Sequence, residues 1–303
     1  GLSSAPLVCM NHERGTMAIC SGLPCRLRGW TLGAMLAFVG LVPDSSALAQ
    51  GFDTTRHDLT LEEQEERYAF VFGNSFFILL HEFGHALINE FSIPVLGREE
   101  DAVDNLATVL LVPDEPDPEI DQILIDAIDG WFMSDDYYAD QGEELAVWGE
   151  HALDAQRAYQ ITCLVYGSDP EGFSDLADST DLPDYRRDSC IDTWDQTERS
   201  WMRVLEPHIR GTGDPKPKVN VFYGPAQSDS EEEMRQILQE TKMLETFASD
   251  LMAEFKLPRT LTVAAEACGE ENAYWIPSEG RIVLCYELMT FYDDMIYWDI
   301  KDR

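Results

Sequence analysis

Residues 81–85 read His81-Glu82-Phe83-Gly84-His85, a polar pattern set inside an apolar run. The flanking residues 76–80 and 86–88 are all apolar. On a helix, side chains four positions apart lie one turn apart on the same face, so both imidazoles point the same way. Polar groups are costly to bury in such a helix without a partner, and a metal ion is one such partner. The pattern predicts a buried helix with a metal site.

Two histidines at this spacing can bind one zinc ion. Glu82 follows the first histidine directly, so its carboxylate can reach a water on the zinc and take its proton. These three residues predict a catalytic zinc centre in which His81 and His85 are ligands and Glu82 is the base. The alternative is a pair of helical histidines that only cap or pack.

A catalytic zinc site usually has three protein ligands and one open position. One class has a glycine three residues after the second histidine and a third histidine three residues later. Those positions hold Ile88 and Phe91, which excludes that class. The next acidic cluster, 99–104, contains Glu100 and Asp104 on one helical face. We expect Glu100 to be the third ligand, and Asp104 to accept the free N–H of a ligand histidine.

Other interpretations of this cluster stay open. Glu99, Asp101 or Asp104 could supply the third ligand instead. In so acidic a chain the cluster could also be a solvated helical face.

The capping box Thr60-Leu61-Glu62-Glu63 predicts a helix from about residue 61 to 91, with a possible break at 73–75. After the polar segment 211–217 the pattern changes to that of a strand, one long helix and three further strands. Further helices are predicted near 99–111, 119–133, 143–166, 188–206 and 231–255, and strands near 218–223, 261–263, 273–276 and 281–285.

These elements predict an α+β, zincin-like fold. Its organisation would be an N-terminal extension with a signal peptide (1–49), a helical metallopeptidase part (50–210) and a small strand-helix-strand-hairpin part (217–303). The last part would fold back beside the helix that carries His81 and complete the active-site cleft. Its outer strand would hold an extended substrate backbone.

The N-terminus has the parts of a secretory signal peptide. Arg26 and Arg28 precede the apolar run 31–43, and small residues at 46–49 suit a cleavage site before Gln50. The run is too short to cross a bilayer comfortably, so we expect no stable membrane span after cleavage; a signal anchor is the alternative. The protein would be secreted or periplasmic.

Four cysteines follow the predicted cleavage site, and an even number in an exported protein suggests two disulfides. Proximity in the sequence favours Cys163–Cys190 and Cys268–Cys285 among the three possible pairings. Four buried thiols are the alternative.

The charge is extreme, at 57 acidic against 21 basic residues and a net charge of −36. Such a surface repels nucleic acid and anionic lipid, so neither is expected as a partner. A peptide or protein substrate is compatible with it.

The residues described so far resemble the gluzincin group of zinc metallopeptidases, which carry HExxH on one helix and E-x-x-x-D on the next. The runs HEFGHALINEFSIPVLGREEDAVDNLA, EHALDAQRAYQITCLVYGSDP, LPDYRRDSC and CGEENAYWIPSEGRIVLCYEL are similar to a bacterial metallopeptidase family whose members are largely uncharacterised. The resemblance covers most of the chain after the signal peptide. It implies a zinc-dependent peptidase with His81, His85 and Glu100 as ligands and Glu82 as base.

A peptidase of this kind needs a second group, besides the metal, to stabilise the developing oxyanion. His151, Arg157 and Tyr159 fall on one predicted helix and are the candidates, with His151 first. Arg157 could instead form an ordinary helix ion pair with Asp154, and Tyr159 could be core.

Two rival functions remain. One is a secreted pseudo-peptidase or binding protein with a structural zinc site, although such a site has no need of Glu82. The other is a zinc hydrolase of a non-peptide amide, which only the shape of the cleft would distinguish.

Overall fold

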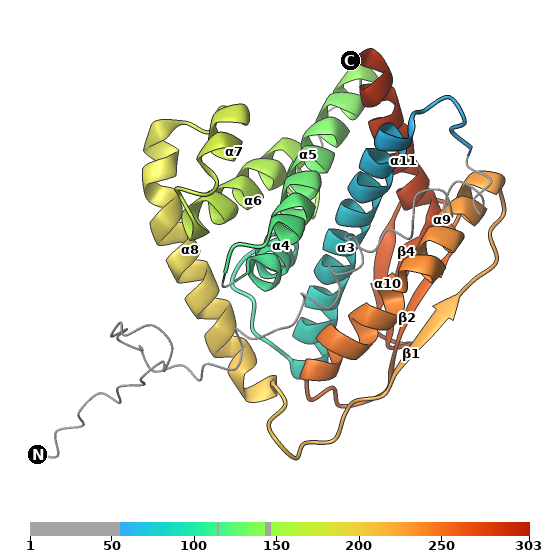
Figure 1. The fold of residues 1–303 in the computed structure, drawn as a ribbon. Helices are drawn as coiled ribbons and strands as arrows, with labels where there is room; N and C mark the ends of the chain where they lie inside the picture. Colours follow the sequence, from blue (N-terminus) through green and yellow to red (C-terminus); the bar gives the residue numbers. More distant parts are fainter. Residues whose placement is uncertain (1–54, 114, 143–146) are drawn as a thin grey trace, which may run out of the picture.

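The computed structural model describes residues 55–303 apart from residue 114 and residues 143–146. The predicted signal peptide and its three cysteines lie outside the described residues. Within them the fold is α+β and mostly helical, with a small sheet near the C-terminus (Figure 1). The α+β class and the small C-terminal sheet agree with the prediction.

Helix α3 (Leu61–Phe91) runs through the centre of the molecule (Figure 1). Thr60 and Glu63 form the predicted capping box at its start, and Ser92 ends it in the left-handed conformation. The helix is long and apolar enough to cross a membrane, but 89% of its most apolar window is buried inside the protein. It is the core helix, and its apolar faces are covered by protein.

The possible break at residues 73–75 is wrong, because α3 continues through them. A Cβ atom on Gly73 would lie 2.8 Å from the Asp126 carboxylate of the neighbouring helix. The glycine therefore permits a close helix crossing and does not interrupt the helix.

Five helices follow α3 and form the helical part of the molecule: α4 (Glu99–Leu111), α5 (Pro118–Asp140), α6 (Asp154–Ser168), α7 (Ser174–Ser179) and α8 (Asp184–Leu205). Helices α4 and α5 pack against α3, and α6 packs against α4 and α5. The disulfide Cys163–Cys190 joins α6 to α8, as predicted, and closes the loop that contains α7.

Two predicted helices differ from the structure. The helix expected over 143–166 begins only at Asp154, and residues 147–153 are not helical. The long helix expected over 231–255 is divided into α9 (Asp229–Thr241), α10 (Met243–Thr246) and two short turns of π and 3-10 helix (Phe247–Leu251 and Met252–Glu254). Lys242 separates α9 from α10 because its φ of 53° lies in the left-handed region, and a right-handed α-helix cannot continue through a residue in that conformation.

The sheet contains β1 (Val219–Tyr223), β2 (Leu261–Glu266), β4 (Arg281–Cys285) and β3 (Ala273–Ile276), in that spatial order. The strands β1, β2 and β4 are parallel, and β3 is antiparallel to β4 at one edge. Helix α11 (Tyr286–Asp302) completes the chain. The predicted disulfide Cys268–Cys285 is present and ties the end of β2 to the end of β4.

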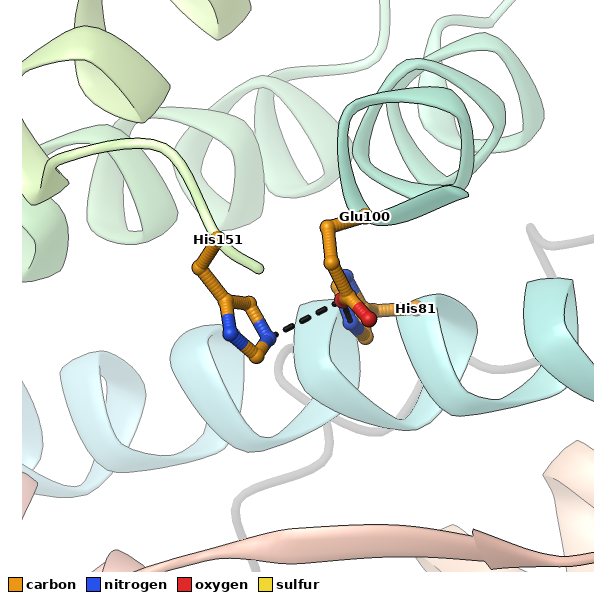
Figure 2. A group of neighbouring side chains, drawn as sticks. All are labelled: His81, Glu100 and His151. Atoms are coloured by element: carbon orange, nitrogen blue, oxygen red, sulfur yellow. Dashed lines mark ion pairs between the residues drawn. The ribbon is translucent and has the colours of Figure 1, made fainter. Parts of the chain in front are cut away.

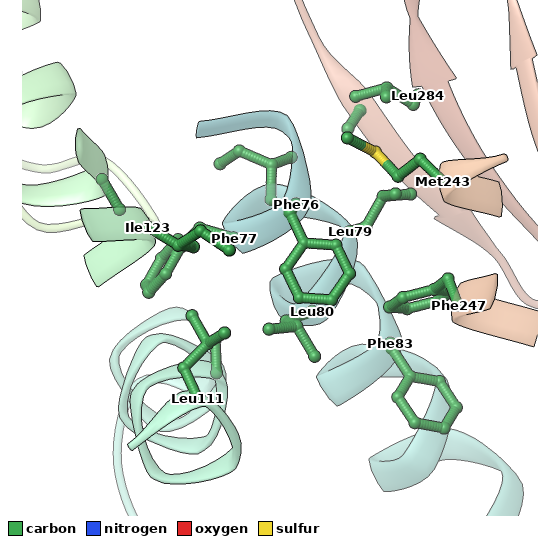
Figure 3. Close-up of a cluster of buried hydrophobic side chains, with 14 of the residues drawn as sticks. Phe76, Phe77, Leu79, Leu80, Phe83, Leu111, Ile123, Met243, Phe247 and Leu284 are labelled. Carbon is green, nitrogen blue, oxygen red and sulfur yellow. The ribbon is translucent and has the colours of Figure 1, made fainter. Parts of the chain in front are cut away.

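The C-terminal part packs directly beside α3, which contacts both β3 and β4. One hydrophobic core is shared by the helical part and the sheet part. Figure 3 shows how α3 supplies it in two directions: Phe77 and Leu80 face Leu111 and Ile123, while Phe76 faces Phe247. Because α3 is held on both sides, its polar residues have fixed positions.

Candidate metal centre

Helix α3 presents His81 and His85 from successive turns. Their ring centroids are 5.0 Å apart, His81 is buried and His85 is half-buried. The spacing of four residues therefore places both imidazoles on one face, as the sequence predicts.

Helix α4 brings Glu100 to these histidines. Its Oε2 atom lies 3.2 Å from Nε2 of His81 and 3.2 Å from Nε2 of His85. The two helices approach closely because residue 84 is glycine: a Cβ atom there would lie 2.8 Å from the Val103 side chain. The close contact between the two helices therefore requires a glycine at this position of the five-residue pattern.

His151 approaches the same carboxylate from the segment before α6. Its Nε2 atom lies 2.9 Å from Oε2 of Glu100, and its side chain is 54% exposed. Figure 2 shows His81, Glu100 and His151 converging from α3, α4 and this segment. The sequence placed His151 on a helix, whereas it precedes the helix start at Asp154.

Neither of the other two oxyanion candidates is beside Glu100, and Arg157 reaches the cluster only at the Nδ1 edge of His81. The Arg157 side chain is buried against Asp104, and Tyr159 is 39% exposed with its ring 5.0 Å from that of Phe132. The predicted helix that was to carry all three candidates is wrong at His151, because α6 begins only at Asp154.

The ligand atoms of His81, Glu100 and His151 lie within 4.8 Å of one another, a group that could hold a metal ion. A tetrahedral site with metal–ligand distances of about 2.0–2.1 Å has ligand atoms about 3.3 Å apart. The three distances from Oε2 of Glu100 to the imidazole Nε2 atoms are 3.2, 3.2 and 2.9 Å. Two imidazoles and a carboxylate with a further imidazole beside them are donors typical of zinc and similar transition metals.

Each of the paired histidines also has a carboxylate at its other ring nitrogen. Asp104 Oδ1 lies 2.7 Å from Nδ1 of His81, and Glu99 Oε1 lies 2.8 Å from Nδ1 of His85. Such partners fix the tautomer that leaves Nε2 free for a metal. The sequence anticipated this contact for Asp104. It assigned Glu99 only as an alternative ligand, and the one available signal was its position directly before Glu100.

Glu82 is buried beside the histidines, with Oε1 4.0 Å from Nε2 of His81. Burial raises the pKa of Glu82, and the neighbouring His81 and His85 oppose that rise. The backbone amide of Trp275 in β3 also favours the charged form. A carboxylate with a raised pKa is a better proton acceptor than an ordinary surface glutamate.

The cluster has strong internal electrostatics. Burial opposes protonation of His81, but Asp104 and Glu100 more than offset it and raise the pKa of His81 to about 9. Burial likewise disfavours the charged form of Glu100, yet hydrogen bonds from His151, His81 and His85 hold the pKa of Glu100 well below its usual range. Burial also opposes protonation of His85, but hydrogen bonds with Glu100 and Glu99 raise the pKa of His85 above its ordinary value.

A second group of potential ligands, Cys268, Cys285 and Glu287, has a structural role. The two cysteines are joined in a disulfide, so neither can bind a metal as a thiolate. Glu287 accepts hydrogen bonds from the backbone amides of Cys268 and Gly269, at 3.0 and 2.6 Å. These contacts fix the loop that leads into β3.

One of three comparisons with known proteins identifies a family for this chain. The family model "DUF4344: Putative metallopeptidase" matches residues 45–205 and 223–299, which is most of the chain and includes every residue of the cluster. Comparison with curated proteins and with solved structures gave no match. Because the family model covers well over half of the sequence, the chain belongs to the DUF4344 family, whose members are described as putative metallopeptidases.

Proposed function

We propose that the protein is a zinc-dependent peptidase, with zinc held by His81, His85 and Glu100. The observation that carries the proposal is the convergence of both Nε2 atoms on one oxygen of Glu100 at 3.2 Å, with the buried Glu82 beside them. When bound, zinc would polarise the scissile carbonyl and lower the pKa of the attacking water.

The residues of the chain have distinct tasks in this proposal. Glu82 takes the proton from the attacking water and later returns it to the leaving amine. Asp104 orients His81 through the 2.7 Å contact at Nδ1. His151 is the candidate for stabilising the oxyanion, because its partly exposed ring lies beside Glu100 on the solvent side of the cluster.

The C-terminal sheet would complete the cleft. In the part of the chain that the structure describes, β3 pairs with β4 on one side only and packs against α3, with the Trp275 backbone amide near Glu82. An extended peptide could add to that edge through backbone hydrogen bonds. The reacting amide would then lie between the sheet edge and the two histidines.

The two disulfides favour an extracellular or periplasmic location, since such bonds persist in oxidising compartments. The predicted signal peptide would direct the protein there. Substrates would then be peptides or proteins outside the cytoplasm.

One observation favours a second function. His151 lies as close to Glu100 as the two helical histidines do, so it could occupy the fourth position around a metal. A site closed by four protein ligands is typical of a structural zinc, and the protein would then bind partners without cleaving them.

Metal analysis combined with a peptide-library digest tests both functions. We expect one zinc per chain in the wild type and in Glu82→Gln, with cleavage in the wild type only. Cleavage that survives in Glu82→Gln would contradict the proposed mechanism. Stoichiometric zinc without cleavage in either protein would favour the structural site.

A further inference from the structure

Arg157 of α6 is almost completely buried, and it binds Asp104 through two parallel contacts. Its Nε donates to Oδ2 of Asp104 at 2.7 Å, and one terminal nitrogen donates to Oδ1 at 2.8 Å. Asp104 is itself 4% exposed. A buried two-point pair of this kind holds a carboxylate in one orientation, which a single contact cannot do.

The guanidinium is also fixed from α5. Its central carbon lies 3.5 Å from the ring centroid of Trp131, a stacking distance that restricts the guanidinium plane. Three helices, α4, α5 and α6, therefore meet at Arg157. The side chain has no freedom to leave Asp104 unless the packing of these helices changes.

Asp104 connects Arg157 to His81. The same Oδ1 atom of Asp104 that accepts from Arg157 lies 2.7 Å from Nδ1 of His81. The terminal nitrogen of Arg157 is 3.4 Å from Nδ1 and can only donate. With an acceptor and a cation both at this edge of the ring, the stable arrangement has a proton on Nδ1 directed at Asp104. Nε2 is then the atom that can bind a metal.

We propose that Arg157, held on Trp131, is a positioning residue for the metal centre. It keeps Asp104 in the orientation that makes His81 present Nε2 to the metal. The inference rests on the proposed function for the existence of the metal. Zinc affinity would then depend on Arg157, a residue that touches neither metal nor substrate.

The carboxylate partners of His81 and His85 differ in burial and in their own contacts, so the effects of changing each partner can be compared. Glu99, the partner of His85, is 47% exposed at its side chain. Within the described residues, no arginine contacts the Glu99 carboxylate as Arg157 contacts Asp104. Removing the charge of Glu99 should therefore weaken metal binding less than disturbing Arg157 does.

The test is zinc affinity measured by competition with a chelator, which requires no catalytic turnover. We expect Arg157→Lys to weaken zinc binding about tenfold or more, within the range found for partners of metal-bound histidines. Arg67→Lys is the matched control. Arg67 is also buried and is paired with Glu233 and Asp293, in contacts that do not involve the metal cluster. It should lose stability while keeping wild-type affinity.

A second variant covers the case in which Arg157→Lys does not fold. Trp131→Leu keeps the ion pair and removes the surface beneath it, and it should weaken zinc binding severalfold. In an Asp104→Asn background, Arg157→Lys should cause little further loss, because both changes disrupt the same unit. Equal affinity losses in the Arg67 and Arg157 variants would overturn the inference. So would wild-type affinity in Trp131→Leu and Arg157→Lys.

The outcome is separate from that of the proposed function. A wild type that cleaves peptides, with an Arg157→Lys variant of full affinity, would remove this inference alone. A wild type that binds zinc in an Arg157-dependent way without cleaving anything would remove the peptidase and leave the positioning role.

Discussion

Asp126, on α5, has a buried carboxylate at the contact between α5 and α3, and its effect on the stability of the protein can be predicted. Its carboxylate faces the Cβ position of Gly73, and among the described residues it accepts a side-chain hydrogen bond from Gln122, at 2.8 Å. Burial is the main cause that raises the pKa of Asp126 to about 7, and the nearby Asp129 and Glu66 add to the rise. At neutral pH and above, the protein therefore keeps a buried carboxylate charged at a cost in stability.

The magnitude follows from the linkage between protonation and folding. The pKa of Asp126 rises from 3.8 to about 7, and each unit corresponds to about 1.4 kcal/mol. Because the folded-state pKa is raised, the unfolded chain ionises first, and stability is lost as the pH rises from about 4 to about 7. The full shift corresponds to about 4 kcal/mol above pH 7, of which roughly two-fifths is already lost at pH 5.

Asp126→Asn removes this cost and preserves the shape of the side chain. We expect the variant to be more stable than the wild type, with a gain about 2.5 kcal/mol larger at pH 8 than at pH 5. The measurement is urea unfolding of both metal-free proteins at the two pH values. Asp136→Asn, on an exposed part of the same helix, is the control and should change stability by about 0.5 kcal/mol or less. A gain equal at both pH values, or a destabilised variant, would refute the reasoning.

Three further predictions concern the metal centre. Since the pKa of His81 is raised to about 9 without metal, zinc binding must displace a proton below that pH. Chelator competition should show affinity rising by up to about tenfold per pH unit between pH 7 and 9, and a flat profile would contradict the assignment. His151→Ala should retain zinc, while kcat falls about 100-fold in a peptide assay; unchanged kcat would exclude its role at the oxyanion. Gly84→Ala should force α3 from α4 at Val103, lower stability by about 1–3 kcal/mol in urea unfolding and weaken zinc binding, whereas wild-type values would refute the close packing.

Local patterns were sufficient to predict much of the molecule. The capping box at Thr60 and the apolar run around His81 predict α3 because both are properties of one helix. The spacing of Glu100 and Asp104 likewise predicts that both side chains leave α4 on one face. The disulfide pairing follows from proximity along the chain.

Contacts between distant residues were not predictable from these patterns. Arg157 and Asp104 are 53 positions apart, and no local spacing relates them. The start of α6 at Asp154 was missed because the apolar periodicity extends over residues that are not helical. The division of the predicted helix 231–255 depends on the left-handed backbone at Lys242, a residue type without a turn signal.

The most direct test of the central claim is a crystal structure of the zinc-loaded protein, with the metal located by its anomalous scattering. We predict one zinc bound to Nε2 of His81, Nε2 of His85 and the carboxylate of Glu100. A fourth position would be open to solvent, with Glu82 beside it. A zinc closed by His151 as a fourth protein ligand, or a zinc bound elsewhere, would contradict the account of a catalytic centre.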